Sequence, residues 1–226
     1  MPTDAPQVKR DGAERLGAEI VFEGTTSVER MQRAEIIAEE EGLIIVPPFD
    51  HRHIIAGQGT VGLEIARAWE DVDMVLEPIG GGGLASGVAA AVNRILPSAK
   101  VIGVEPEGAA SMRRALENGS PILLPKVETI ADGLKPVIAG QLTFEHANDL
   151  MDDVVTVDDE SIRDAARMLV HKHKLVVEFS GAATTAALLS GRVKCEGGRV
   201  AAVISGGNLG MLAECAECPA APLGAT

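Results

Sequence analysis

Four consecutive glycines, Gly80 to Gly83, follow the apolar run Met74 to Ile79 and precede a helix-like stretch from Leu84 to Ile95. This order of strand, loop and helix places a row of backbone N–H groups at a helix N-terminus, where unpaired donors and the helix dipole favour an anion. Glycine allows close approach of the backbone to such a ligand. A flexible surface loop is the simpler alternative, but the tight placement between strand and helix favours a phosphate-binding loop.

Composition limits the classes of protein that this chain can represent. Its 226 residues suffice for one large domain, or for one domain and part of another. Aromatic residues make up only 2% of the chain, so the core must consist of small aliphatic side chains, as in parallel strands buried between helices. The net charge of -13 opposes binding to nucleic acid or to an anionic membrane. Because the sequence shows no spanning apolar run and no signal-peptide pattern, we expect a cytoplasmic location.

Strand and helix patterns alternate along the chain, which predicts an α/β fold with a mostly parallel sheet and helices on both faces. The predicted strands cover residues 19–22, 43–46, 74–78, 101–104, 154–157 and 200–204. The predicted helices cover residues 6–17, 26–41, 59–69, 84–95, 111–118, 144–151, 159–172 and 180–189. The stretch from 119 to 141 is expected to be irregular.

A second turn motif, Ser205-Gly-Gly-Asn208, follows the last predicted strand. Ligands of open α/β sheets bind at the carboxyl ends of strands, and both glycine motifs occur at such ends. The Ser205 hydroxyl can form a hydrogen bond with a ligand atom there. By itself the motif is equally typical of a hairpin or of a helix entry, but together the two motifs predict a shared ligand site.

Six stretches, in order, resemble the threonine/serine dehydratase and serine racemase branch of the fold-type II pyridoxal-phosphate enzymes. They are Ile55-Ala-Gly-Gln-Gly-Thr60, Glu77-Pro-Ile-Gly-Gly-Gly-Gly-Leu84, Gly103-Val-Glu-Pro106, Thr129-Ile-Ala-Asp-Gly133, Val177-Glu-Phe-Ser-Gly-Ala-Ala183 and Ser205-Gly-Gly-Asn208. The resemblance implies a large cofactor domain over residues 51–226, with residues 1–50 as a remnant of the smaller domain. It also implies pyridoxal 5'-phosphate as the cofactor.

The resemblance further implies roles for particular residues. The cofactor phosphate would bind at Gly80, Gly81, Gly82, Gly83 and the amide of Leu84, and Ser205 would form a hydrogen bond with the pyridine nitrogen. Gly133 and Glu178 would line the pocket. A neutral hydroxyl at the ring nitrogen makes the ring a milder electron sink than a carboxylate would, which suits prompt loss of a β-hydroxyl group. The implied activity is conversion of L-threonine or L-serine to a 2-oxo acid and ammonia, with serine racemization as an alternative.

Two motifs of the family do not occur in this chain: Ser-Phe-Lys-x-Arg-Gly, which holds the cofactor-binding lysine, and Ser-x-Asn-His-x-Gln. The lysines that do occur lack that context, and each is interpreted as a solvated surface charge; they are Lys9, Lys100, Lys126, Lys135, Lys172, Lys174 and Lys194. We therefore expect no catalytic residue here and an inactive chain, as a fragment, a truncated product or half of a two-chain enzyme. A non-catalytic binding or regulatory protein is the alternative.

A cation site is a further implication of the resemblance. Some relatives bind a divalent cation through positions that correspond to Glu105, the carbonyl of Ala109, and Ser111. A serine in place of the second carboxylate removes charge that a hard cation needs, so divalent binding is expected to be weak, with a monovalent ion or water equally suited.

Other interpretations of single motifs have less support. Gly80, Gly82 and Ala85 fit a dinucleotide-binding fingerprint, with Glu105 at the spacing of a ribose-binding acid, but this leaves Ser205 without a role. Cys195 and the pair Cys215 and Cys218 are interpreted as free thiols. Missing strands would expose hydrophobic edges, so we expect a homo-oligomer, or dependence on the absent N-terminal segment.

Overall fold

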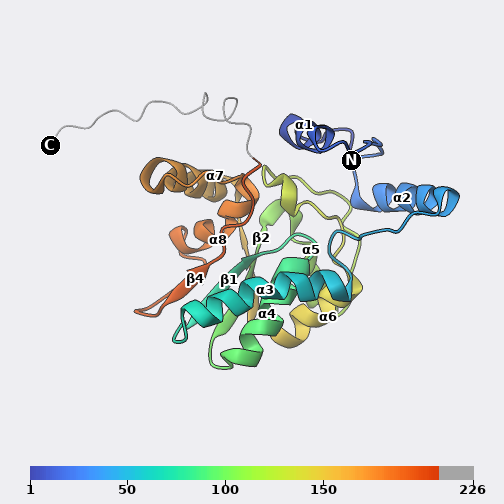
Figure 1. Cartoon of the computed structure of the whole chain (residues 1–226). Coiled ribbons are helices and arrows are strands. Elements are labelled where there is room, and N and C mark those ends of the chain that lie inside the picture. Colours follow the sequence, from blue (N-terminus) through green and yellow to red (C-terminus); the bar gives the residue numbers. More distant parts are fainter. Residues whose placement is uncertain (209–226) are drawn as a thin grey trace, which may run out of the picture.

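The computed structural model of the protein describes residues 1–208. At its centre lies a sheet of parallel strands in the order β3-β2-β1-β4 (Figure 1). The strands are β1 (Met74–Pro78), β2 (Lys100–Pro106), β3 (Asp153–Val157) and β4 (Val200–Ala202). The predicted α/β class with a parallel sheet is therefore confirmed.

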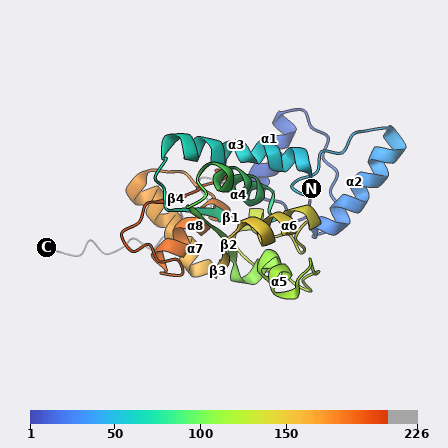
Figure 2. The ribbon, with the colours of Figure 1, turned by 90° about the horizontal axis from the view of Figure 1, so that it is seen from below.

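Helices cover both faces of this sheet (Figure 2). The α-helices are α1 (Gln7–Arg15), α2 (Ser27–Glu41), α3 (Arg52–Ala68), α4 (Gly83–Ile95), α5 (Ser111–Asn118), α6 (Gln141–Leu150), α7 (Asp159–Met168) and α8 (Phe179–Leu189). Short 3₁₀ turns occur at η1 (Glu107–Ala109) and η2 (Asp132–Leu134), and a π-helical turn, η3 (Leu169–His173), follows α7. On one face α7 and α8 pack against Leu76, Ile102 and Val104, and on the other α4 packs against Val75 and Val101.

Small residues allow these layers to approach closely. The buried face of α8 is built largely from alanines that pack on the sheet, which fits the aromatic-poor composition. Where α3 crosses α4, Gly59 and Gly87 bring the two helix backbones together: a Cβ atom at Gly87 would overlap the Ile55 carbonyl oxygen. Gly59 of the Ile55–Thr60 motif thus serves helix packing.

The N-terminal part of the chain differs from the prediction. Residues 19–22 and 43–46 do not form strands, and α1 and α2 bury none of their residues. Leu43, Ile44 and Val46 are 56%, 92% and 76% exposed. A strand needs a neighbour to accept and donate its backbone hydrogen bonds, and within residues 1–208 no strand lies beside residues 43–46, so their β-branched pattern is not realised. The domain boundary at residue 50 stays a prediction.

Most other boundaries agree with the sequence patterns. The capping box of α2 forms as expected, with Glu29 N–H donating to Thr26 Oγ1 and the Glu29 carboxylate accepting from Thr26 N–H. Helix α3 begins seven residues earlier than predicted because the His51 ring accepts a hydrogen bond from His53 N–H and caps the first turn. In the described part of the chain, no helix is both long and apolar enough to cross a membrane.

Candidate cofactor site

The sheet topology places the two glycine motifs side by side. From β1 the chain moves through β2 to β3 on one side, whereas β4 pairs with β1 on the other side. The order of strands therefore reverses between β1 and β4, and in open α/β sheets the ligand crevice lies at the carboxyl ends of the strands at such a reversal. The loop that begins at Ile79 leaves β1 there, and Ser205 follows β4 at the same edge.

The glycine loop leads directly into α4. Gly82 has a φ of 91°, a conformation that favours glycine, and Gly83 is the first residue of the helix. The first amides of a helix have no carbonyl partner within it, so this 13-residue helix presents donors and the positive end of its dipole to the crevice. The predicted order of strand, glycine loop and helix is confirmed.

Other parts of the protein pack closely against all four glycines of the loop. A Cβ atom at Gly80 would lie 2.9 Å from the Gly133 carbonyl oxygen, and one at Gly82 would lie 2.8 Å from atoms of Met112 and Thr143. At Gly81 and Gly83 a Cβ atom would meet Phe49. The four glycines are therefore required by packing inside the protein as well as by any phosphate.

Two polar residues fix the loop from the side of α6. Thr143 Oγ1 donates a hydrogen bond of 2.7 Å to the Gly81 carbonyl oxygen. The Asp50 carboxylate accepts hydrogen bonds from Gln141 N–H and Thr143 N–H at 3.0 and 3.1 Å, at the start of α6. Phe49 and Asp50 were not singled out from the sequence, and the only local signal was their position after the Pro47-Pro48 break.

The opposite wall of the crevice contains the other predicted residues. Gly133 N–H donates to Ser180 Oγ at 2.9 Å, and Glu178 N–H donates to the Gly206 carbonyl oxygen at 3.2 Å. A Cβ atom at Gly206 would overlap the Glu178 carboxylate, and one at Gly181 would overlap the Ser205 carbonyl oxygen. Together with the contact between Gly80 and Gly133, these packings join all the predicted cofactor-binding segments into one site.

Glu178 and Lys9 meet at the edge of this site. One oxygen of Glu178, Oε2, is buried without a hydrogen-bond partner in the structure, and the Lys9 ammonium lies 3.7 Å from it. Lys9 Nζ also lies 2.7 Å from Asp132 Oδ2, and its side chain is 26% exposed. The interpretation of Lys9 as a solvated surface charge is therefore wrong. No local pattern shows the contact, because Lys9 and Asp132 are 123 residues apart in the sequence.

The residues of the predicted cation site lie where β2 leads through η1 to α5. The two oxygens of Glu105 accept hydrogen bonds of 2.8 Å from Met112 N–H and Arg113 N–H at the start of α5. Burial raises the pKa of the Glu105 carboxyl to about 8, although these amides oppose the shift. Ala109 and Ser111 are also buried, but residues 1–208 contain no group of three or more His, Cys, Asp or Glu side chains placed to hold a metal ion.

The position of Glu105 also bears on the dinucleotide interpretation. A ribose-binding acid must face the crevice, whereas this carboxylate is buried against the α5 backbone. The pair Cys215 and Cys218 lies outside the described residues, and Cys195 is a free, exposed thiol as expected.

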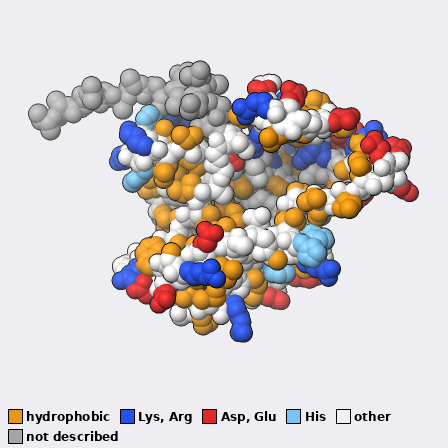
Figure 3. Space-filling model, in the orientation of Figure 1, with side chains coloured by type: hydrophobic (Ala, Val, Ile, Leu, Met, Phe, Trp, Pro, Cys, Tyr) orange, Lys and Arg blue, Asp and Glu red, His pale blue; other side chains and the backbone are white. Residues whose placement is uncertain are grey.

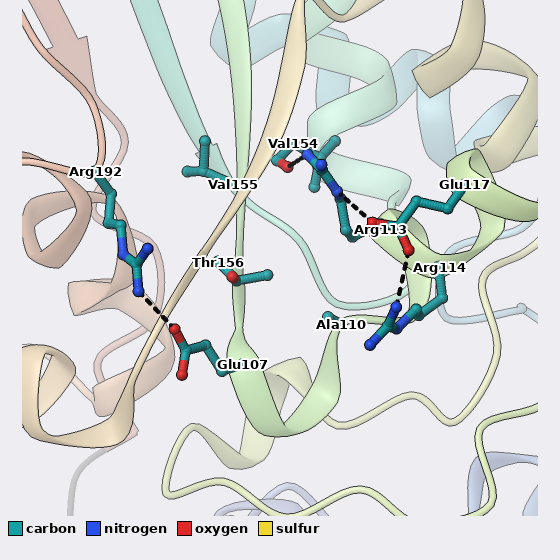
Figure 4. A pocket seen from close by; sticks show the side chains of 9 residues that line it. All are labelled: Glu107, Ala110, Arg113, Arg114, Glu117, Val154, Val155, Thr156 and Arg192. Atoms are coloured by element: carbon teal, nitrogen blue, oxygen red, sulfur yellow. Dashed lines mark hydrogen bonds and ion pairs between the residues drawn. The ribbon is translucent and has the colours of Figure 1, made fainter.

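A surface pocket of about 480 Å³ lies away from the glycine loops, between η1, α5 and β3 (Figure 4). Its charged side chains bind one another: Arg192 pairs with Glu107, and both Arg113 and Arg114 pair with Glu117. Arg113 also donates to the Val154 carbonyl oxygen on the sheet edge. These internal pairs account for the polar lining, and the pocket shares no residue with the candidate site.

The residues at the crevice are compatible with the pyridoxal phosphate that the resemblance implies. A helix N-terminus reached through four glycines suits a dianionic phosphate, and a serine on the neighbouring strand end suits a ring nitrogen. The Glu178 oxygen that lacks a hydrogen-bond partner provides a buried polar atom beside them. We found the same family by comparison with known proteins: residues 1–206 match the family described as pyridoxal-phosphate dependent enzyme. The chain belongs to this family.

Several members of the family are closely similar in sequence. A putative threonine dehydratase of Sinorhizobium fredii is 43% identical over 208 residues, which cover 91% of this chain and 63% of the relative. The L-threonine ammonia-lyase of Thermotoga maritima is 42% identical over 209 residues, or 92% of this chain and 52% of the relative. The chain thus spans about half to two thirds of the length of these relatives.

Solved structures agree with the sequence comparison. Maize serine racemase superposes with a TM-score of 0.86 at 35% identity, over 93% of this chain and 65% of that one. Threonine deaminase isoform 2 from Solanum lycopersicum gives a TM-score of 0.83 at 38% identity, over 93% of this chain and 62% of that one. The family resemblance inferred from motifs is confirmed.

Proposed function

We propose that this chain provides the cofactor-binding part of an L-threonine or L-serine dehydratase. The observation that carries the proposal is the position of two turns at the strand reversal, the glycine loop after β1 and the Ser205 turn after β4, where a ligand of an open α/β sheet binds. The names of the relatives, threonine dehydratase and L-threonine ammonia-lyase, support a small hydroxy amino acid as substrate. Serine racemization is the second candidate, because maize serine racemase has this fold.

The chain's own residues would act by binding and orienting. The amides of Gly80 to Leu84 would hold the cofactor phosphate, and Ser205 would position the pyridine nitrogen without giving it a full charge. Gly133 and Glu178 would form the wall beside the ring. The bound cofactor supplies an electron sink for the bonds at the substrate α-carbon.

The larger assembly is also part of the proposal. Because the chain lacks the Ser-Phe-Lys-x-Arg-Gly and Ser-x-Asn-His-x-Gln motifs, catalysis would require a polypeptide that carries them, and the chain alone would be inactive. We further propose a homo-oligomer in the cytoplasm, with residues 1–50 belonging to the smaller domain of the family. A purely regulatory binding protein is the alternative that the missing lysine favours.

The first test is titration of the purified chain with pyridoxal phosphate, followed by absorbance and fluorescence. We expect a dissociation constant between about 10 µM and 1 mM, since phosphate contacts remain while a covalent bond and part of the pocket are absent. No ammonia should form from L-threonine or L-serine. Adding a polypeptide with both missing motifs should restore 2-oxo acid production.

The control variants follow from the structure. Ser205→Ala should weaken cofactor binding several-fold, whereas Ser190→Ala, at the far end of α8, should leave it unchanged. A substitution at Gly81 would be a poor control because it displaces Phe49 as well as the phosphate. Ordinary turnover of L-threonine by the chain alone, or a covalent adduct on one of its lysines after borohydride reduction, would refute the absence of a catalytic lysine.

A further inference from the structure

Lys9 is the place where the N-terminal helix α1 meets the candidate site. Helix α1 buries none of its own residues, yet the Lys9 side chain extends to a partly buried position. Its ammonium nitrogen lies 2.7 Å from Asp132 Oδ2, across 123 residues of sequence, and 3.7 Å from Glu178 Oε2. One cation therefore contacts two carboxylates from distant segments.

The two carboxylates belong to different walls of the crevice. Asp132 begins η2 and directly precedes Gly133, which contacts the glycine loop at Gly80. Glu178 is the N-cap residue of α8, and its carboxylate packs against Gly206 beside Ser205. The ammonium group thus connects the wall that contacts the glycine loop with the wall that carries Ser205.

The Lys9 ammonium compensates the negative charge of a partly buried carboxylate, that of Glu178. The Glu178 side chain is only 13% exposed, and its Oε2 atom has no hydrogen-bond partner in the structure. A partly buried carboxylate of this kind is unfavourable unless a nearby cation compensates it. Asp132 is the second acid beside Lys9, so removal of Lys9 would leave the partly buried Glu178 carboxylate and the Asp132 carboxylate without the cation that they share.

We propose that Lys9 is a positioning residue of the cofactor pocket: it holds η2 and the start of α8 together and keeps the Glu178 carboxylate beside the ring site. This inference rests on the proposed cofactor function, and it assigns to α1 a role in forming the pocket. Lys9 acts through Asp132 and Glu178 and does not itself contact the glycine loop.

The chain offers a matched control in Lys126. Its ammonium forms an ion pair with Glu128, but both side chains are 76% exposed. Exposed pairs of this kind contribute little. Lys9→Met therefore removes a positive charge that bridges two carboxylates, whereas Lys126→Met removes one that is exposed to solvent. Lys9→Arg keeps a cation at the bridging position.

The experiment combines two measurements on the full chain. Titration with pyridoxal phosphate should show about tenfold weaker binding for Lys9→Met, binding within about threefold of wild type for Lys9→Arg, and no change for Lys126→Met. Hydrogen exchange without cofactor should be faster in Lys9→Met at residues 130–134 and 176–181, while the urea midpoint stays that of the control. A double-mutant cycle with Asp132→Asn should show that the two effects are coupled.

The outcomes separate this inference from the proposed function. If wild type binds pyridoxal phosphate and Lys9→Met binds equally well, the positioning role is wrong. If wild type does not bind it, the proposed function fails, and hydrogen exchange alone decides whether Lys9 connects the two walls. Unchanged exchange in both segments would overturn the inference in either case.

Discussion

Glycine positions in this chain differ sharply in their tolerance of a side chain. At Gly181 a Cβ atom would overlap the Ser205 carbonyl oxygen, because α8 begins against the strand end that carries Ser205. At Gly57, on the exposed side of α3, a Cβ atom would meet nothing within 4 Å. Both glycines lie in helices, so replacing each by alanine adds the same methyl group and differs only in the space around it.

We expect Gly181→Ala to lower the free energy of unfolding by about 2–3 kcal/mol, since backbone must move to admit the methyl group. It should also weaken pyridoxal phosphate binding by displacing Ser205. Gly57→Ala should instead raise stability by about 0.5–1 kcal/mol, because alanine is the better helix former. Urea denaturation measures both effects, and equal responses at the two positions would contradict the packing account.

At the level of elements, strand β1 contains a buried carboxyl group, that of Glu77. Glu77 is fully buried in the centre of the sheet, and neither of its carboxylate oxygens has a hydrogen-bond partner in the structure. Desolvation raises the pKa of its carboxyl to about 9. The folded protein therefore keeps this carboxyl protonated at pH 7, while the unfolded chain ionises it above its ordinary pKa of 4.5.

The sign of the pH effect follows from proton binding. Between pH 4.5 and about 9 the folded state holds one proton more than the unfolded state at Glu77, so stability falls as pH rises and levels off above about 9. We expect Glu77→Gln to remove the Glu77 contribution to this slope, while the contribution of Glu105 remains, and to raise the unfolding free energy by about 2–4 kcal/mol at pH 8. Thermal or urea unfolding of both proteins from pH 5 to 9 is the measurement, and parallel pH profiles would exclude the effect.

For the whole molecule, the exposed apolar segment at residues 43–46 is the main liability for solubility. Figure 3 shows apolar side chains on the surface where α2 leads to α3. Extended, uncharged and β-branched segments of this kind associate with other strands. The negative net charge opposes that association without covering the segment.

We predict concentration-dependent self-association in size-exclusion chromatography with light scattering. Ile44→Lys should shift the protein towards the monomer, because it places a charge at the most exposed position of the segment. Leu16→Lys serves as the control: Leu16 is 89% exposed but lies outside the segment, so its substitution should change nothing. A wild-type chain that is monomeric at every concentration would contradict this prediction.

The sequence predicted those parts of the molecule whose structure depends on residues adjacent in the sequence. Strand β1 and helix α5 were placed to the residue because turns and glycines end them locally. The failure at residues 43–46 has the opposite cause, since a strand forms only when another segment pairs with it. The same holds in the site: the glycine loop was evident, but the contacts of Asp50 with α6 and of Lys9 with Asp132 span 91 and 123 residues.

The close packing around the glycine loop also has a consequence for protein engineering. At all four positions an added side chain would collide with Phe49, with the backbone near Gly133 or with Thr143 and Met112, so the loop offers only its backbone to a ligand. Its preference among anions can therefore not be redesigned within the loop. A designer who wants a different ligand must work on the wall formed by Gly133, Glu178 and Ser205, or replace Phe49 first to make room.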